Sequence, residues 1–283
     1  NVNPNLKINL YGQELNDVTY SICKSDLLMM NENPENIHGP TTSISDDRLD
    51  GEKFDYMITN PPFGVSWKSE KEFVDNESKD PNGRFFIGTP RSNDGSLLFL
   101  QHLIHKMNPE GSRIGIIFNG SPLFTGDAGS GESEIRKWII ENDWLECIVQ
   151  LPDQMFFNTK ITTYFWIITN KKSSKRKGKV QLIDGSSFSR PLKKNLGDKS
   201  KFIDDEQISS LFQIYKNNEE NEFCKIFSNN YFGYTKVIVE RPLKENGEIQ
   251  TDKKGNLKSD KKRQDDERVP LSNNIEDYFQ REV

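Results

Sequence analysis

Cysteine is scarce in this sequence, and long apolar runs and targeting signals are missing. Three cysteines occur in 283 residues, far apart and without a Cys-x-x-Cys pair, which argues against a disulfide framework and a zinc site. No run reaches the ~20 apolar residues that a membrane span needs, and no signal peptide is present. These absences favour a cytoplasmic protein without a membrane segment, with two reduced thiols buried among apolar neighbours. The cysteines are Cys23, Cys147 and Cys224.

An excess of positive charge is missing too. The formal net charge is −5, from 38 Lys and Arg against 43 Asp and Glu, which argues against a protein that holds nucleic acid by general electrostatics alone. A local basic groove, or a partner subunit that presents the DNA, stays compatible with this charge. Basic residues gather at 171–179 and 253–263, where a solvated loop is favoured and nucleic-acid contact is the alternative.

The chain has no initiating methionine and ends abruptly at Arg281-Glu282-Val283. Both features favour a fragment of a longer polypeptide. Hydrophobic residues make up 33% of the sequence and aromatic residues 11%, which is enough to fill a core.

Apolar runs and helical spacing alternate along the chain, which predicts an α/β fold. Continuous apolar strands indicate a sheet covered on both faces, a doubly wound and mostly parallel architecture. Loops are expected at 31–51, 66–93 and 121–130, the second as a long surface segment. Asp94 and Ser133 are the expected helix caps. Strands are predicted at residues 6–11, 54–59, 113–118, 144–151, 162–169 and 180–183, and helices at 17–28, 96–107, 133–141, 204–215 and 274–281.

Composition divides the chain near residue 240. Residues 1–240 hold the apolar segments and form the expected main domain. After Val239 the chain becomes polar, and 244–268 consists almost wholly of charged residues, Gly, Asn and Gln. Residues 241–283 are therefore predicted to be a polar hairpin or linker that leads into a C-terminal helical region.

The most informative segment is Asn60-Pro61-Pro62-Phe63-Gly64, which directly follows the predicted strand at 54–59. Ligands of open α/β sheets lie beyond the carboxyl ends of strands. Two prolines fix φ at about −65° and donate no N–H group, so the corner is stiff and lined with acceptors. The alternative is that Asn-Pro-Pro merely ends a strand, as proline pairs often do.

Such a corner suits methylation of an amino group whose lone pair is delocalised, as in adenine. The side-chain oxygen of Asn60 and the carbonyl of Pro61 would accept from both N–H groups, which localises the lone pair toward a methyl donor in a preorganised site. Phe63 would stack on the base once it leaves the duplex, a contact worth ~1–3 kcal/mol. The amide of Asn60 keeps the site neutral, because no general base is required before transfer.

With its surroundings, this corner resembles the methylation (M) subunit of type I restriction-modification systems, a family of N6-adenine DNA methyltransferases. The set of matching stretches is far more specific than the Asn-Pro-Pro-Phe motif alone. The stretches follow the family's order and cover nearly the whole chain. They are Tyr11-Gly12-Gln13-Glu14, Gly51 to Tyr56, Asn60 to Gly64, Asn93 to Phe99, Leu123 to Gly126, Gly131 to Arg136, Leu151-Pro152 with Phe156 to Thr159, and Phe165 to Ile167.

The resemblance implies a fold of the S-adenosylmethionine-dependent methyltransferase type, S-adenosyl-L-methionine as cofactor, and double-stranded DNA with a flipped adenine as substrate. It implies Asn60, Pro61, Pro62 and Phe63 as catalytic residues. Glu14, past the end of the first strand, matches the carboxylate that binds the donor's ribose hydroxyls. The implied partners are a specificity (S) subunit, a restriction/translocase (R) subunit and a second M subunit.

Two features of the family have no match. The Gly-rich donor-binding loop and its strand, expected ahead of Leu6, are missing, so the catalytic domain at 1–240 is expected to be truncated at its N-terminus. The acid expected to face the donor adenine has no clear counterpart in residues 39–44. Asp46 and Asp47 lie too near the next element for a transfer of that role.

Some further candidates have weaker signals. Phe156 or Phe157 could form a wall opposite Phe63, with Phe157 assigned to base stacking; a core aromatic is the alternative. Residues 126–131 invite a phosphate-loop interpretation but lack its Lys and spacing, which favours a mobile loop. No metal site is expected, because the histidines show no ligand spacing with acidic partners: His38, His102 and His105.

Two other functions stay open. Protein glutamine N5-methyltransferases use a similar Asn-Pro-Pro-aromatic loop, because an amide nitrogen poses the same chemical problem. Their last motif residue is usually Tyr, so Phe63 and the long insertions favour DNA. The second of these alternatives, motivated by the missing donor loop, is a non-catalytic assembly module.

Overall fold

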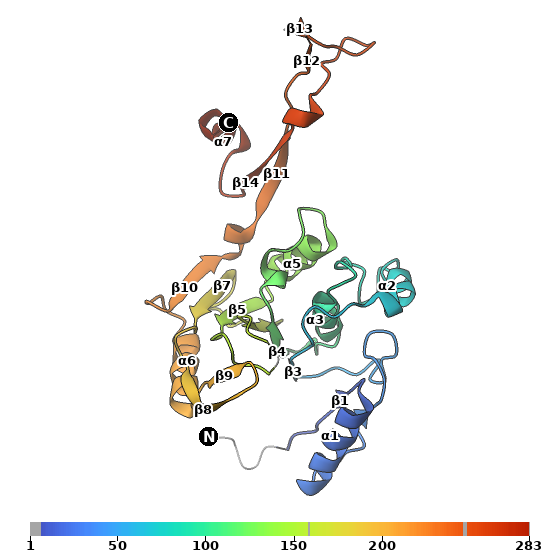
Figure 1. Cartoon of the computed structure of the whole chain (residues 1–283), viewed down its shortest axis with the longest axis vertical. Helices are drawn as coiled ribbons and strands as arrows, with labels where there is room; N and C mark the ends of the chain where they lie inside the picture. The colour runs from blue at the N-terminus through green and yellow to red at the C-terminus, as the bar shows by residue number, and fades with distance from the viewer. Residues whose placement is uncertain (1–6, 158, 246–247, 283) are drawn as a thin grey trace. The chain divides into compact units, whose positions relative to one another are not determined.

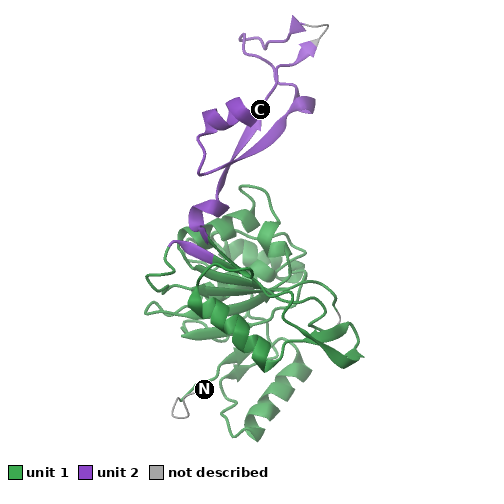
Figure 2. Ribbon diagram, turned by 90° about the vertical axis from the view of Figure 1, so that its left-hand side faces the viewer, with its two compact units in different colours: residues 1–177, 181–226 green, residues 178–180, 227–283 purple. Residues whose placement is uncertain are grey.

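The computed structural model describes residues 7–157, 159–245 and 248–282. The chain forms two compact units, the first of residues 1–177 and 181–226 and the second of residues 178–180 and 227–283 (Figure 2). Across the described residues, no helix has the length and apolar character needed to cross a membrane.

A six-stranded sheet forms the centre of the fold, in the order β10-β7-β5-β6-β4-β3 (Figure 1). The β3–β4 and β5–β7 pairs are parallel, whereas β6 runs antiparallel to both β4 and β5. The predicted α/β class is therefore confirmed, with β6 reversed relative to its two neighbours. The strands are β3 (Tyr56–Thr59), β4 (Arg113–Phe118), β5 (Leu145–Gln150), β6 (Tyr164–Thr169), β7 (Lys179–Asp184) and β10 (Cys224–Ser228).

Helices cover the sheet because its strands are apolar on both sides. Helix α6 (Asp205–Asn217) packs Leu211, Ile214 and Tyr215 on a cluster that includes the buried thiols of Cys147 and Cys224. Helix α3 (Ser96–His105) packs against β4 and against α5 (Gly131–Glu141). Both buried cysteines are free thiols, as predicted.

Strand β3 lies at the edge of the sheet and is only partly covered. Met57 is buried, but Tyr56 and Ile58, which alternate with it onto the other face, are 77% and 86% exposed. The helical cover of that face therefore does not extend over β3.

The N-terminal part of the first unit holds a separate pair of short strands. β1 (Gly12–Gln13) pairs in parallel with β2 (Ile37–His38), and α1 (Asp17–Met29) connects them. The prediction of a strand at 6–11 is wrong for residues 7–11, because strand pairing begins only at Gly12. Leu6 lies outside the described residues. The side chain of Asn16 caps α1 by accepting from the Thr19 N–H.

The segment at 66–93 is not the surface loop that the sequence predicted. It contains a 3-10 turn (Lys68–Glu70) and α2 (Lys71–Glu77), and three of its apolar residues are buried in a core cluster with two residues from outside the segment. Polar residues separate these apolar ones without a helical or strand period, so the pattern does not reveal their burial. The cluster comprises Ile44, Trp67, Val74, Phe85 and Leu98.

Several element boundaries also differ from the prediction. Helix α3 ends at His105 rather than at 107, and Asp94 precedes its N-cap Gly95 while accepting from the Ser96 N–H. Helix α5 begins at Gly131 with Ser130, not Ser133, as its cap. The sequence did not predict α4 (Ser121–Phe124), β8 (Arg190–Leu196), β9 (Lys199–Phe202) or β10.

The second unit is built on an antiparallel pair. β11 (Tyr234–Val239) and β14 (Asp265–Pro270) pair along six residues, and Val269 is buried. Gly233 lets Leu271 approach closely, since an added Cβ would lie 2.3 Å from its Cδ1. The other elements are the 3-10 turns Asn229–Phe232 and Lys261–Arg263, β12 (Lys244–Glu245), β13 (Glu248–Ile249) and α7 (Ile275–Glu282).

Replacement of Phe85 tests whether the cluster around it is a true core. Its side chain is fully buried, so Phe85→Ala is expected to lower the free energy of unfolding by about 3–5 kcal/mol. Phe86→Ala is the matched control, because Phe86 is 47% exposed. Urea denaturation measures both. Equal losses in the two variants would contradict the assignment.

Candidate active site

The predicted corner lies at the carboxyl end of β3 and at the protein surface. Strand β3 ends at Thr59, and Asn60 and Pro62 are exposed while Pro61 is buried. Gly64 closes the corner with φ of +63°, in the left-handed region that glycine adopts without a Cβ penalty. The chain thus leaves the sheet abruptly, with Asn60 at the turn.

The side chain of Asn60 is free to bind a ligand. It makes no hydrogen bond with any residue that the structure describes. The two prolines that follow have no N–H group to compete for its oxygen. An exposed amide on a stiff corner is therefore available as an acceptor.

Phe63 meets an aromatic partner, and the partner is Phe156. Their ring centroids are 6.4 Å apart and the rings are nearly perpendicular. Phe157 is 60% exposed, with the Lys199 ammonium 5.0 Å from its ring centroid. Between the two candidates from the sequence, Phe156 is the one that lies against Phe63; Asn158, next in the matched stretch, lies outside the described residues.

Residues 91–95 hold the chain that leaves the corner. The Gly95 N–H donates to the carbonyl of Val65 at 2.9 Å, and the indole of Trp67 donates to the carbonyl of Arg91 at 3.0 Å. A second backbone bond runs from the Trp67 N–H to Ser92. Backbone groups of Arg91, Ser92 and Gly95 thus hold the chain that follows the corner.

Glu14 directly follows β1, and its backbone is fixed on both sides. Its N–H donates to His38 at 3.0 Å, and its carbonyl accepts from Thr41 at 3.0 Å. One carboxylate oxygen accepts from the Asn16 N–H at 2.6 Å. Gly39 allows this packing, because an added Cβ would lie 2.6 Å from the Glu14 carbonyl oxygen. The second carboxylate oxygen makes no hydrogen bond within the described part of the chain.

The segments that carry Glu14 and Asn60 meet at their beginnings. Tyr11, just before β1, and Phe54, just before β3, have ring centroids 5.4 Å apart. No hydrogen bond or ion pair between described residues joins Glu14 itself to Asn60 or Phe63. The structure therefore links the two strands of the site but not the two functional side chains.

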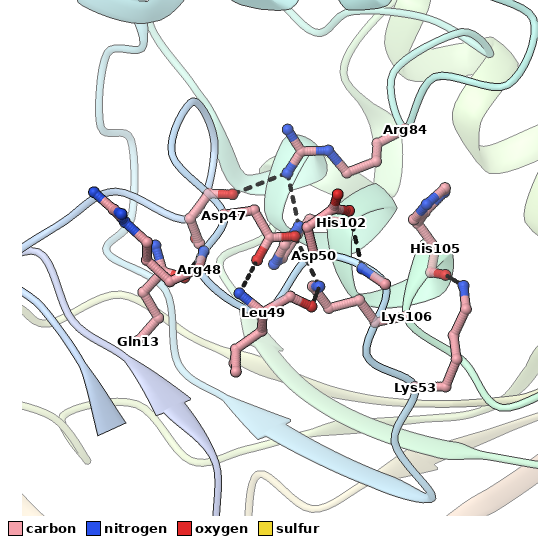
Figure 3. A network of polar contacts seen from close by, with 12 residues as sticks. Gln13, Asp47, Arg48, Leu49, Asp50, Lys53, Arg84, His102, His105 and Lys106 are labelled. Carbon is pink, nitrogen blue, oxygen red and sulfur yellow. Dashed lines mark hydrogen bonds and ion pairs between the residues drawn. The ribbon is translucent and has the colours of Figure 1, made fainter. Parts of the chain in front are cut away.

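A buried ion pair holds the loop that runs from β2 to β3. The Lys106 ammonium lies 2.7 Å from the carboxylate of Asp47 and donates to the carbonyl of Leu49 at 2.5 Å (Figure 3). Both charged side chains are at least nine-tenths buried. The side chain of Gln13 binds the same loop, donating to Asp46 and accepting from Arg48. The loop is thereby fixed next to Glu14.

Arg84 forms a second attachment for this loop. Its guanidinium binds both carboxylate oxygens of Glu77 at 2.7 Å. It also donates to the carbonyls of Ser43 and Ile44 at 2.9 and 2.6 Å. Such bidentate, charge-assisted bonds fix geometry strongly. Arg84 could not be predicted from the sequence, because an isolated Arg in a polar stretch carries no periodic signal.

His102 completes the network as a neutral side chain. Burial, followed by the nearby charge of Arg84, lowers the pKa of His102 to about 4. Because a guanidinium only donates, the His102 Nδ1 accepts the 2.9 Å bond from Arg84. From the sequence, His102 was predicted to be an ordinary helix position. Its spacing of four residues from Lys106, on an apolar helix, was the available signal.

Other candidates from the sequence do not add to the site. The described residues contain no group of three or more side chains that could hold a metal ion. At the Gly-rich stretch 126–131, the Arg136 guanidinium binds the carbonyls of Pro122, Thr125 and Gly126. A small pocket of about 10 Å³ lies between Arg91 and Glu132, without Asn60 or Glu14 in its lining. It is smaller than ligand sites usually are.

Comparison with known proteins decides the family. The sequence profile of the N-6 DNA methylases matches residues 2–238. This chain belongs to that family. The resemblance seen in the sequence is thereby confirmed for this N-6 DNA methylase chain.

Individual relatives agree with this assignment. The methylase subunit of the type I restriction enzyme MjaIX from Methanocaldococcus jannaschii is 28% identical over 253 residues, covering 87% of this chain and 42% of the relative. The corresponding HindI subunit from Haemophilus influenzae is 33% identical over 177 residues, covering 62% of this chain and 38% of the relative. The chain thus spans less than half the length of these relatives.

Solved structures confirm the fold. The structure of a type I restriction-modification methyltransferase subunit from Streptococcus thermophilus superposes with a TM-score of 0.64 at 25% identity. The match covers 77% of this methylase chain and 44% of that protein. A protein from Listeria monocytogenes that is 14% identical shares the fold, with a TM-score of 0.51 over 76% of this chain and 56% of that protein.

The neutral state of His102 predicts a dependence of stability on pH. The unfolded state binds a proton near pH 6.5 and the folded state only near pH 4. The free energy of unfolding should therefore fall as pH decreases from 6.5 to 4, by up to about 3 kcal/mol from this group. His102→Asn keeps an acceptor for Arg84 but does not titrate. Denaturant melts from pH 4 to 8 should show a smaller loss in the variant, and identical losses would refute the assignment.

Proposed function

We propose that this chain is the catalytic core of an adenine-specific DNA methyltransferase, which transfers a methyl group from S-adenosyl-L-methionine to the N6 atom of adenine. The observation that carries the proposal is the exposed Asn60 amide on a stiff, proline-locked corner at the end of β3. The family to which the chain belongs supports the same chemistry.

In this proposal the corner receives an adenine turned out of the duplex. The exocyclic N–H groups donate to the Asn60 side-chain oxygen and to the Pro61 carbonyl. Both bonds localise the nitrogen lone pair, and they are preorganised because the prolines hold the backbone. Phe63 stacks on the base, and its edge contact with Phe156 limits its rotation. Phe157 stays a candidate for the second wall of the base pocket.

Glu14 is the proposed ligand of the donor's ribose hydroxyls. Its backbone is fixed by His38 and Thr41, and one carboxylate oxygen is already occupied by the Asn16 N–H. The other oxygen is left for a hydroxyl donor, so the residues present fit this role. The donor supplies an electrophilic methyl group; the chain's residues bind and orient it.

The proposed assembly follows the type I systems named among the relatives. A specificity (S) subunit would choose the DNA sequence, a restriction/translocase (R) subunit would cleave, and a second M subunit would complete the modification enzyme. The substrate is double-stranded DNA with a flipped adenine. The net charge of −5 agrees with a chain that receives DNA together with partners.

Asn60→Ala tests the role of the corner. Loss of one preorganised acceptor is expected to lower the rate of methyl transfer by about 100- to 1,000-fold. Donor affinity should stay unchanged, since Asn60 contacts only the base. The measurement is transfer of labelled methyl to duplex DNA by the native protein, purified with its bound subunits. Labelling of protein instead of DNA would favour a glutamine methyltransferase and overturn the proposal.

Glu14→Gln tests the donor site separately. Removal of the charge weakens its bonds to the ribose hydroxyls and should raise the Kd for the donor about 10- to 100-fold. The maximal rate at saturating donor should change little, because Glu14 is proposed to bind the ribose and not the transferred methyl group. Titration calorimetry gives the Kd. An unchanged Kd would remove Glu14 from the donor site.

A further inference from the structure

Positive charge is concentrated in one part of the second unit. Residues 248–263, here named the basic arm, belong to the connection between β11 and β14 (Figure 1). They carry six basic and three acidic residues in a chain of net charge −5. The basic arm is thus positive while the rest of the protein is strongly negative. Its basic residues are Lys253, Lys254, Lys258, Lys261, Lys262 and Arg263.

Backbone hydrogen bonds give the basic arm a defined shape. The Gln250 N–H donates to Leu243 at 2.8 Å, and the Lys258 N–H donates to Gln250 at 2.9 Å. At the turn, the Asp252 N–H donates to the Asn256 carbonyl at 2.8 Å. A solvated, structureless run of charges would not show such pairing. The lysines are therefore presented by an ordered scaffold.

Two of the three acids of the basic arm bind its backbone through their carboxylates. The carboxylate of Asp252 accepts from the N–H groups of Lys254 and Asn256 at 2.7 and 2.9 Å. The carboxylate of Asp260 accepts from the Lys262 N–H at 3.0 Å. None of the five lysines forms an ion pair with a residue that the structure describes. Their ammonium groups are exposed and available to an anionic partner.

The side chains of the basic arm select among anionic partners. No aromatic residue occurs from 235 to 277, so the region has neither a stacking platform for single-stranded bases nor the aromatic anchors of a protein interface. Five of its six cations are lysines, which bind phosphates as point charges, whereas base readout favours bidentate arginine. This composition fits contact with phosphates and not with bases.

We propose that the basic arm binds the phosphate backbone of double-stranded DNA independently of base sequence. The proposal rests on the proposed function, which supplies a DNA substrate to this chain. The contact gives an otherwise acidic protein a local attraction for DNA and leaves the choice of sequence to other parts of the complex.

The test compares two triple variants with equal changes in charge. The arm variant is Lys253→Gln/Lys254→Gln/Lys258→Gln. The control is Lys193→Gln/Lys194→Gln/Lys225→Gln, whose lysines are equally exposed and lie in β8 and β10. Binding of the native protein to poly(dG)·poly(dC) is measured over a range of salt concentrations without donor. This duplex has no adenine, so the result does not depend on methyl transfer.

The expected result is a loss of salt dependence in the arm variant. Its slope of log K against log salt should be smaller by about three, which is about one unit for each lysine removed, and equally so on unrelated duplexes. The control variant should lose less than one unit. Equal slopes in both variants would overturn the proposal. Unchanged DNA binding together with weaker binding to poly-glutamate would overturn it in favour of an acidic protein partner.

Failure of this proposal can be distinguished from failure of the proposed function. Labelled methyl transfer reports the proposed function, and its absence with an intact arm effect leaves the arm contact standing. Conversely, methyl transfer together with equal salt slopes in the arm and control variants would overturn only the proposed DNA contact of the basic arm. The unfolding curve of the arm variant should match that of the unchanged protein, because the three lysines are exposed.

Discussion

The corner at Asn60 depends on the parallel pairing of β3 with β4. Strand β4 is well buried, since Ile114, Ile116 and Phe118 are fully shielded from solvent. The register sets Met57 opposite Ile114 and Thr59 opposite Ile116. A slip of one residue would turn Met57 outward and disrupt the core. Apolar packing thus determines where the strand ends, and the functional amide takes its position from that end.

The loop ahead of β3 needs a different support, because residues 39–50 offer little apolar surface. Buried charges supply it through Lys106 and Arg84, which bind carbonyls of the loop as well as carboxylates. A buried pair of this kind contributes little net stability, since desolvation offsets the attraction. It does demand one geometry, and removal of either partner leaves an uncompensated charge. The network therefore fixes the conformation of the loop beside Glu14 more than it adds to the stability of the fold.

The sequence predicted the elements whose signal is local. The strand at 113–118 matched in full, and the helices around 17–28 and 204–215 matched within two residues at each end, because apolar period and caps mark them. The motif at Asn60 was found for the same reason. Contacts between distant segments were not predictable: the burial of Phe85 and the ring contact of Phe63 with Phe156 depend on tertiary packing. The role of Lys106 was hidden because its partner lies in a loop 59 residues earlier.

The position of β3 at the edge of the sheet has a consequence for the corner that follows it. Among the described strands β3 pairs with β4 alone, so its outer row of N–H and C=O groups is unmatched next to the exposed side chains of Tyr56 and Ile58. An unprotected edge of this kind is a template for adding foreign strands, and natural proteins usually blunt it with charge or a bulge. Neither device interrupts these four residues. A strand added to this edge would end beside Asn60, so whatever pairs with β3 also borders the corner that has to admit a base.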